Sequence, residues 1–217
     1  MRKTFTISIL LLLLSVSLTL GDGVLYNLFK EGWGFNSGEE VGDSWGAIGL
    51  LKPVQPENPP LDFDYDNFEF TWVLQDAMIT AVEDYGSAMV IYLQGGSLGI
   101  YKDASFNFGP GSDPFDGIIS ATDGELVLGG GMYNAVIALS FGTETGSILG
   151  DIFFDSGSRL AELEALNVSG WHIFDGMTWS PEVSVPDGYH SRFAGRIYSE
   201  ESVATLETDW SRIKSLY

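Results

Sequence analysis

The segment Phe68-Glu-Phe-Thr-Trp-Val-Leu-Gln75 carries the pattern from which the fold can be inferred. Large apolar side chains occupy every second position, at Phe68, Phe70, Trp72 and Leu74. Because successive side chains of a β-strand point to opposite faces, this spacing puts all four on one face. The segment therefore predicts a half-buried strand.

Segments of the same kind recur along the chain and are separated by short turns that are rich in Gly and Asp. Gln94-Gly-Gly96 and Asp123-Gly124 are typical of these turns. The expected strands cover residues 45–51, 68–75, 78–85, 88–94, 98–102, 124–128, 135–141, 147–154, 170–174 and 192–198. Consecutive antiparallel strands joined in this way predict a mainly β fold, which we expect to be an antiparallel β-sandwich or jelly roll.

In two segments the apolar residues recur at the spacing of a helix instead of the spacing of a strand. Leu160, Leu163 and Leu166 lie three residues apart and predict one short helix over residues 158–166. A second apolar stripe predicts a C-terminal amphipathic helix, and it consists of Val203, Leu206, Trp210 and Ile213.

The chain begins with the features of a secretory signal peptide. Arg2 and Lys3 precede an apolar run over residues 5–20, which the small residue Gly21 follows. The run is shorter than the roughly 20 residues that a helix needs to cross a bilayer. We therefore expect a signal peptide at residues 1–21, a β-sandwich domain at 22–199 and a C-terminal helical tail at 200–217. The protein is then secreted, periplasmic or extracellular, with no transmembrane span after cleavage.

The charge balance excludes one large class of partners. The chain has 30 Asp and Glu residues against 10 Lys and Arg residues, a formal net charge of −20. Nucleic-acid binding needs clustered Lys and Arg to displace the counterions of phosphate groups, so we expect no nucleic-acid partner. The sequence also contains no Cys. Disulfides, thiolate metal sites and a Cys nucleophile are therefore excluded.

Several segments occur in a recognisable order, from residues 70–74 through Gly95-Gly-Ser-Leu-Gly-Ile-Tyr-Lys-Asp103 and residues 121–129 to residues 170–174 and 185–197. This order resembles a group of secreted, Gly-rich β proteins of bacteria, some of which carry the PEP-CTERM tail that exosortases sort. The resemblance covers about residues 60–198 and implies a β fold and secretion, but no catalytic residue. The chain lacks the Val/Pro-Glu-Pro motif, the terminal apolar helix and the basic end, so sorting by exosortase is not implied.

The densest acidic run places Asp62, Asp64 and Asp66 at alternate positions. On a strand these three carboxylates would share one face and repel one another unless they are solvated or neutralised by a cation. Calcium is the cation that such carboxylates favour. The run does not fit an EF-hand, because Asn67 and Val73 stand where that loop needs Gly and Glu. Two interpretations stay open: a solvated acidic face, and a calcium site formed by Asp62, Asp64 and Asp66.

The sequence contains few candidate catalytic groups. Gly95-Gly-Ser-Leu-Gly99 matches the G-x-S-x-G motif of hydrolases, in which the Ser stands on a turn between a strand and a helix. A strand rather than a helix is expected after it, so we interpret the motif as a hairpin turn. His172 and His190 have no partner at the spacing of a metal site. Acidic pairs are too numerous for the sequence to select one as a glycosidase pair.

Two tryptophans are the candidate ligand-binding residues. Trp33 lies between two glycines and Trp179 precedes Ser180-Pro181, so both are expected to be exposed and able to stack on a sugar. We expect a secreted, non-catalytic β-sandwich protein with a structural or cell-surface role. The alternative is a carbohydrate-binding module or polysaccharide-acting enzyme, whose partner would be an extracellular polysaccharide or a component of the cell surface.

Overall fold

The computed structural model describes residues 24–53, 59–166, 168, 170–179 and 183–200. The signal peptide and the C-terminal helix expected from the sequence lie outside these residues. The described elements are β1 (Val24–Asn36), β2 (Ser44–Lys52), β3 (Glu69–Asp84), β4 (Ala88–Gln94), β5 (Ser97–Asp103), α2 (Pro114–Thr122), β6 (Glu125–Ser140), β7 (Thr145–Ser156), α3 (Leu160–Glu164), β8 (Trp171–Thr178) and β9 (Ser191–Glu200).

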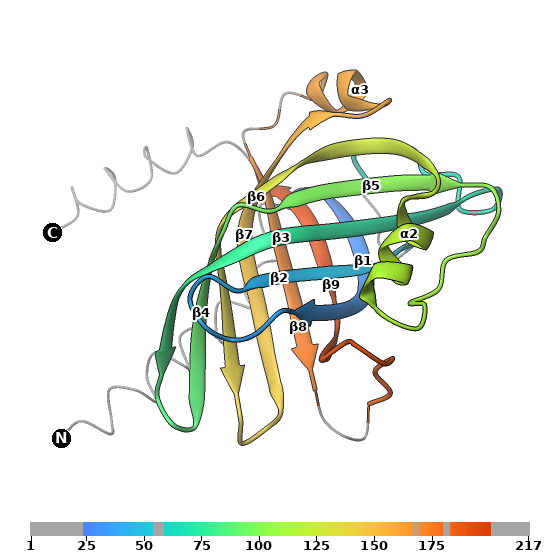
Figure 1. Cartoon of the computed structure of the whole chain (residues 1–217). Helices are drawn as coiled ribbons and strands as arrows, with labels where there is room; N and C mark the ends of the chain where they lie inside the picture. The colour runs from blue at the N-terminus through green and yellow to red at the C-terminus, as the bar shows by residue number, and fades with distance from the viewer. Residues whose placement is uncertain (1–23, 54–58, 167, 169, 180–182, 201–217) are drawn as a thin grey trace, which may run out of the picture.

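The strands close into an eight-stranded antiparallel barrel (Figure 1). Apart from β4 and β5, each described strand pairs with the next along the chain, and β1 pairs with both β2 and β9, which closes the ring. β4 and β5 act together as one of the eight strands, because both pair with β3 and with β6. Gly95 and Gly96 join them with positive φ angles of 71° and 101°, a conformation that glycine adopts readily.

The expected sandwich or jelly roll is therefore wrong. Its strand positions agree with the structure, but β1 was not expected, because Gly and charged residues interrupt its apolar pattern. Without β1 the first and last strands have no common neighbour and the sheet would stay open. In the closed ring every described strand has a neighbour on both sides, although residues 80–84 of β3 and 153–156 of β7 pair on one side alone.

Two pairs of expected strands are halves of single long strands. The expected strands 68–75 and 78–85 together form β3, and 124–128 and 135–141 together form β6. Asp76 and Asn134 interrupt them with positive φ angles of 58° and 51°. The pairing register shifts beside both residues. Such bulges bend a strand and break its apolar alternation, which explains the split expectation.

Helix α2 covers part of the outer face of the barrel (Figure 1). Its buried residue Ala121 belongs to a small apolar cluster with the outward-facing Ile48 of β2 and Val73 of β3. The Thr71 hydroxyl donates to the Ala121 carbonyl at 2.5 Å and anchors the helix to β3. The Asp113 carboxylate caps the helix by accepting from the Asp116 backbone N–H. Sequence periodicity did not reveal this helix, because it is only nine residues long.

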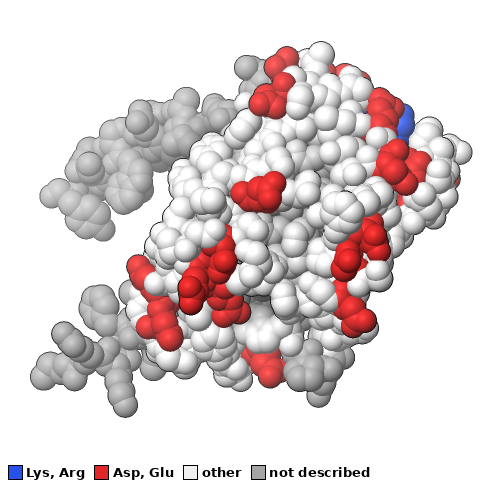
Figure 2. Space-filling model, in the orientation of Figure 1, with Lys and Arg blue, Asp and Glu red and all other residues white. Residues whose placement is uncertain are grey.

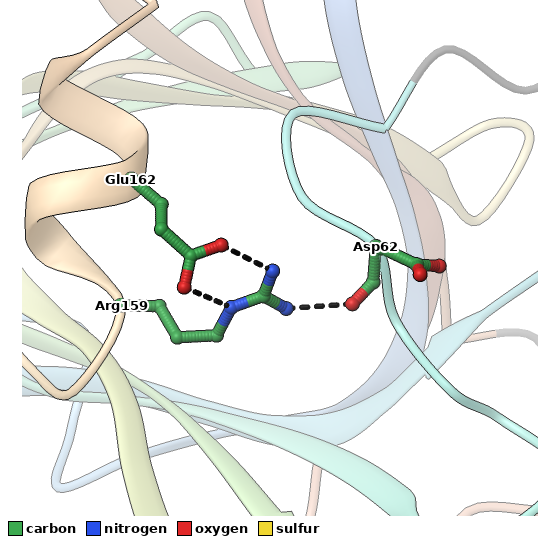
Figure 3. A network of polar contacts seen from close by, with 3 residues as sticks. All are labelled: Asp62, Arg159 and Glu162. Atoms are coloured by element: carbon green, nitrogen blue, oxygen red, sulfur yellow. Dashed lines mark hydrogen bonds and ion pairs between the residues drawn. The ribbon is translucent and has the colours of Figure 1, made fainter.

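One end of the barrel is closed by the segment 59–68 and by α3. Leu61, Phe63 and Leu163 are buried in the same apolar cluster as the barrel interior. Arg159, at the start of α3, joins the two parts (Figure 3). Its guanidinium donates to the Asp62 carbonyl at 2.6 Å and forms two bonds with the Glu162 carboxylate, at 3.0 and 2.6 Å. The expected helix over 158–166 coincides with α3, which is shorter at both ends.

Candidate functional site: a cavity at the open end of the barrel

The opposite end of the barrel contains a cavity of about 530 Å³. The turns β1–β2, β3–β4 and β6–β7 and the segment between β8 and β9 surround this end, and two of these turns point downward in Figure 1. The described residues that line the cavity are Gly34, Phe35, Asn36, Ser37, Gly38, Glu39, Trp45, Ile79, Ile91, Ile137, Leu139, Phe141, Met177, Trp179, His190 and Ser191.

The floor of the cavity is apolar. Trp45, Ile79, Ile91, Ile137 and Met177 line it, and each is at most 8% exposed. They come from β2, β3, β4, β6 and β8, where alternation turns them toward the barrel axis. Because five strands contribute one side chain each, the shape of the floor depends on closure of the ring.

Below the floor the barrel is filled. The Phe193 ring packs between Trp45 and Trp72, with ring centroids 6.4 and 5.3 Å away. The Lys30 ammonium lies 3.9 Å from the centroid of the Trp72 ring, and it pairs with Asp175. These fully enclosed residues separate the cavity from the closed end, so the barrel is a cup rather than a channel.

The Lys30–Asp175 pair is the one ion pair among the described residues whose two side chains are both buried. Desolvation by burial lowers the pKa of the Lys30 ammonium, and the nearby Asp175 carboxylate opposes this change. Burial likewise raises the pKa of Asp175, against the effect of Lys30. Neither residue lines the cavity, so we assign the pair to the packing of the barrel interior.

The rim of the cavity has an aromatic side and a polar side. Trp179 and Phe141 contact each other edge to face, with ring centroids 6.4 Å apart. The polar side combines the β1–β2 turn, with Glu39, and the residue that directly precedes β9, His190. The His190 backbone N–H donates to the Gly34 carbonyl at 2.9 Å, which fixes this side to β1.

The structure separates the two tryptophans expected to bind a ligand. Trp179 lines the cavity. Trp33 faces outward from β1 and is half-buried against Phe108 and Tyr189, with both ring centroids 6.2 Å away. Phe108 stacks on the Trp33 ring, so part of the surface that sugar stacking would use is already in contact with another aromatic ring.

The three aspartates proposed as calcium ligands lie at the closed end. Asp62, Asp64 and Asp66 are exposed on the irregular segment before β3, not on a strand. The Asp64 carboxylate already accepts bonds from the Asn67 backbone N–H and side-chain amide, at 3.2 and 2.8 Å. Within the described ranges no group of three or more His, Asp or Glu side chains is arranged to hold a metal ion. A calcium site here stays a prediction.

The remaining candidate groups are scattered over the molecule. Ser97, in the G-x-S-x-G match, is the first residue of strand β5, so a strand and not a helix comes directly after the turn. His172 lies on the outer face of β8, where its Nδ1 is 2.9 Å from Asp151 Oδ1. His190 lies at the rim of the cavity. The structure therefore does not bring these residues together into one catalytic site.

Sequence reasoning missed the cavity, apart from Trp179. Alternation shows that Ile79, Ile91 and Ile137 are buried, but it cannot show that space remains between them. Comparisons with protein-family models, curated proteins and solved structures found no match. In the part of the chain that the structure describes, no helix has the length and apolar character needed to span a membrane.

Proposed function

We propose that this protein is a secreted, non-catalytic binding protein that holds a small, predominantly apolar ligand in the open end of its barrel. The observation that carries the proposal is the cup itself: a filled, capped end below and a cavity of about 530 Å³ above. Ligand cavities typically measure roughly 300–1,000 Å³ and often occupy the mouths of β-barrels.

The lining favours a ligand with an apolar body. A molecule seated on Ile79, Ile91 and Ile137 would remove its own apolar surface and theirs from water, which is favourable in proportion to the area buried. The edge-to-face pair of Trp179 and Phe141 adds an aromatic wall. Polar groups stand along one side of the rim, where they can orient the ligand without lining the floor.

The arrangement of polar groups favours binding over catalysis. Among the described lining residues, the titratable side chains are those of Glu39 and His190. No hydrogen bond joins these two side chains in the described structure, and each lies on a different segment of the rim. General acid–base catalysis needs groups held within hydrogen-bond reach of the reacting atoms. We therefore assign Glu39 and His190 to binding.

The secreted location rests on the features of residues 1–21. A secreted cup of this kind is compatible with a role at the cell surface, where it would hold or deliver its ligand. The carbohydrate alternative depended on Trp33 and Trp179, and Trp33 is packed against other aromatic rings. An apolar ligand would contact the apolar floor as well as Trp179, so we favour an apolar ligand over a carbohydrate.

A fluorescence titration tests the proposed function. N-phenyl-1-naphthylamine is uncharged and brightens in apolar surroundings, so saturable brightening at one probe per protein is expected. Leu139→Trp adds bulk to the cavity wall, whereas Leu149→Trp makes the same change on the outer face, where Leu149 is 43% exposed. We expect Leu139→Trp to weaken binding at least tenfold and Leu149→Trp to leave it unchanged. Absence of saturable binding, or equal binding by both variants, would contradict the proposal.

A further inference from the structure

We infer that the ligand of the barrel cavity is an organic cation, namely an amine or quaternary ammonium group attached to an apolar body. This inference rests on the proposed function and names the chemical class of the ligand. It is carried by two independent features of the open end, the charge of its rim and the aromatic character of its wall.

The first feature is the acidic rim. The described residues of the four connections at the open end, 37–43, 85–87, 141–144 and 183–190, include no Lys or Arg. Their acidic residues are Glu39, Glu40, Asp43, Glu144 and Asp187. Figure 2 shows acidic side chains in several separate patches on the visible face, whereas described basic side chains appear at one place. The described residues of these connections therefore carry negative charge that no Lys or Arg among them offsets.

The described basic residues lie outside these connections, and most have partners. Lys52, Lys102 and Arg159 form ion pairs with Glu31, Glu125 and Glu162 near the closed end. Lys30 is sealed in the interior. Arg192 is the second residue of β9, next to the rim, but it does not line the cavity and its guanidinium lies 3.7 Å from the Glu31 carboxylate. Arg196 lies further along β9. A cleft bordered by charge of one sign and by low-dielectric walls concentrates its field, so this mouth attracts cations and repels anions.

The second feature is the aromatic lining. Trp45 forms part of the floor, and Trp179 and Phe141 form part of the wall. Aromatic faces attract ammonium groups, and tryptophan does so most strongly. Glu39 also lines the cavity and supplies a carboxylate at the rim. An ammonium group held between Trp179 and the Glu39 side can be stabilised by both, while its apolar body lies on the floor.

An anionic ligand of the same shape would be disfavoured at this site. Its headgroup would have to leave water beside Glu39, and His190 is the one group among the described lining residues that could carry a positive charge. A neutral ligand would gain the apolar contacts but nothing from the rim. The three classes of ligand therefore differ in affinity even when their apolar bodies are identical.

Three probes with the same eight-carbon tail test the inference by titration calorimetry: octyltrimethylammonium, n-octanol and octyl sulfate. We expect the ammonium probe to bind about tenfold more tightly than the alcohol, and the sulfate to bind most weakly. Added salt should weaken binding of the ammonium probe and leave that of the alcohol unchanged, because ions screen exposed charges.

Two matched double variants locate the effect. Glu39→Gln with Glu40→Gln removes two exposed charges at the open end, and Asp62→Asn with Asp66→Asn removes two exposed charges at the closed end. Both change the net charge equally. We expect the first variant to weaken binding of the ammonium probe at least threefold without affecting the alcohol, and the second to change neither.

The outcomes distinguish the inference from the proposed function. If the alcohol and the ammonium probe bind equally, or if both double variants behave alike, the cation inference is overturned and the apolar cup stands. If neither these probes nor N-phenyl-1-naphthylamine bind saturably, the proposed function fails and the inference fails with it.

Discussion

Lys30 Nζ lies 2.5 Å from Asp175 Oδ2, although their strands, β1 and β8, do not pair with each other. Strand β9 lies between them, and Gly195 of β9 is opposite Lys30 on one side and Asp175 on the other. Because Gly195 has no side chain, the two charged groups meet over it inside the barrel. The pair thus connects three neighbouring strands at the place where the ring closes.

Removing one member of this pair should destabilise the folded protein. Lys30→Met leaves the Asp175 carboxylate buried without its partner, and we expect the free energy of unfolding to fall by about 3–5 kcal/mol. The double variant Lys30→Met with Asp175→Leu should recover most of this loss, because the buried charges are gone. Urea unfolding followed by circular dichroism measures both. A single variant as stable as the wild type would contradict this view of the pair.

Gly195 should not tolerate a side chain. A Cβ there would lie 2.0 Å from the Phe174 carbonyl oxygen and 2.4 Å from Asp175 Oδ1. We expect Gly195→Ala to lower the free energy of unfolding by roughly 2–3 kcal/mol, the upper part of the roughly 1–3 kcal/mol typical of overpacked sites. Gly176→Ala is the matched control, because its Cβ would meet nothing closer than 3.9 Å. Thermal melting of both variants suffices, and equal melting temperatures would count against the account.

Arg159 should hold in place the segment 59–68, which helps to close one end of the barrel. Arg159→Met removes its bonds to the Asp62 carbonyl and to Glu162, and we expect a loss of about 1–2 kcal/mol. Glu162→Gln removes the exposed partner but keeps the bond to Asp62, so a loss below about 1 kcal/mol is expected. Hydrogen exchange should accelerate at residues 59–66 in the Arg159 variant alone. Similar rates of hydrogen exchange in the two variants would show that the bond to Asp62 does not hold the segment 59–68 in place.

Loss of the Tyr189 hydroxyl proton should make the folded protein less stable in alkaline solution. Its hydroxyl donates to the Pro110 carbonyl at 2.8 Å. Burial, together with Asp113 and Asp116, raises the pKa of Tyr189 to about 12. The folded state therefore keeps the proton at a pH where the unfolded state has lost it. The contribution of the Tyr189 hydroxyl to the free energy of unfolding is full below about pH 10 and is lost as the pH rises toward about 12.

A comparison with Tyr189→Phe isolates this contribution, because other titrating groups cancel. The stability difference between the wild type and this variant should be constant up to about pH 9 and should narrow above about pH 10. Urea unfolding at several pH values measures it. A difference that stays constant or widens in alkaline solution would contradict the assignment.

The sequence predicted most strands but not the closed ring. Alternation in residues 68–75 reports which face of a strand is buried, and a sandwich and a barrel share that property. Closure depends on β1, whose Gly32 and Gly34 weaken the apolar pattern, and on bulges at Asp76 and Asn134. These features depend on contacts between distant strands, so a local pattern cannot specify them.

The candidate site was less predictable than the fold. The position of Trp179 before Ser180-Pro181 predicts an exposed ring, and Trp179 does line the cavity. The two glycines beside Trp33 predict an exposed ring as well, yet Phe108, from a distant loop, stacks on it. The floor residues could be recognised as core but not as cavity, because the unfilled volume results from how five strands converge.

A methyl NMR titration with N-phenyl-1-naphthylamine tests the binding cup most directly. With labelled Ile, Leu and Met methyl groups, we expect shifts at Ile79, Ile91, Ile137 and Met177 on the cavity floor. Leu61 and Leu163 at the closed end should not move. Shifts confined to outer-face residues such as Leu149, or to the closed end, would contradict the account.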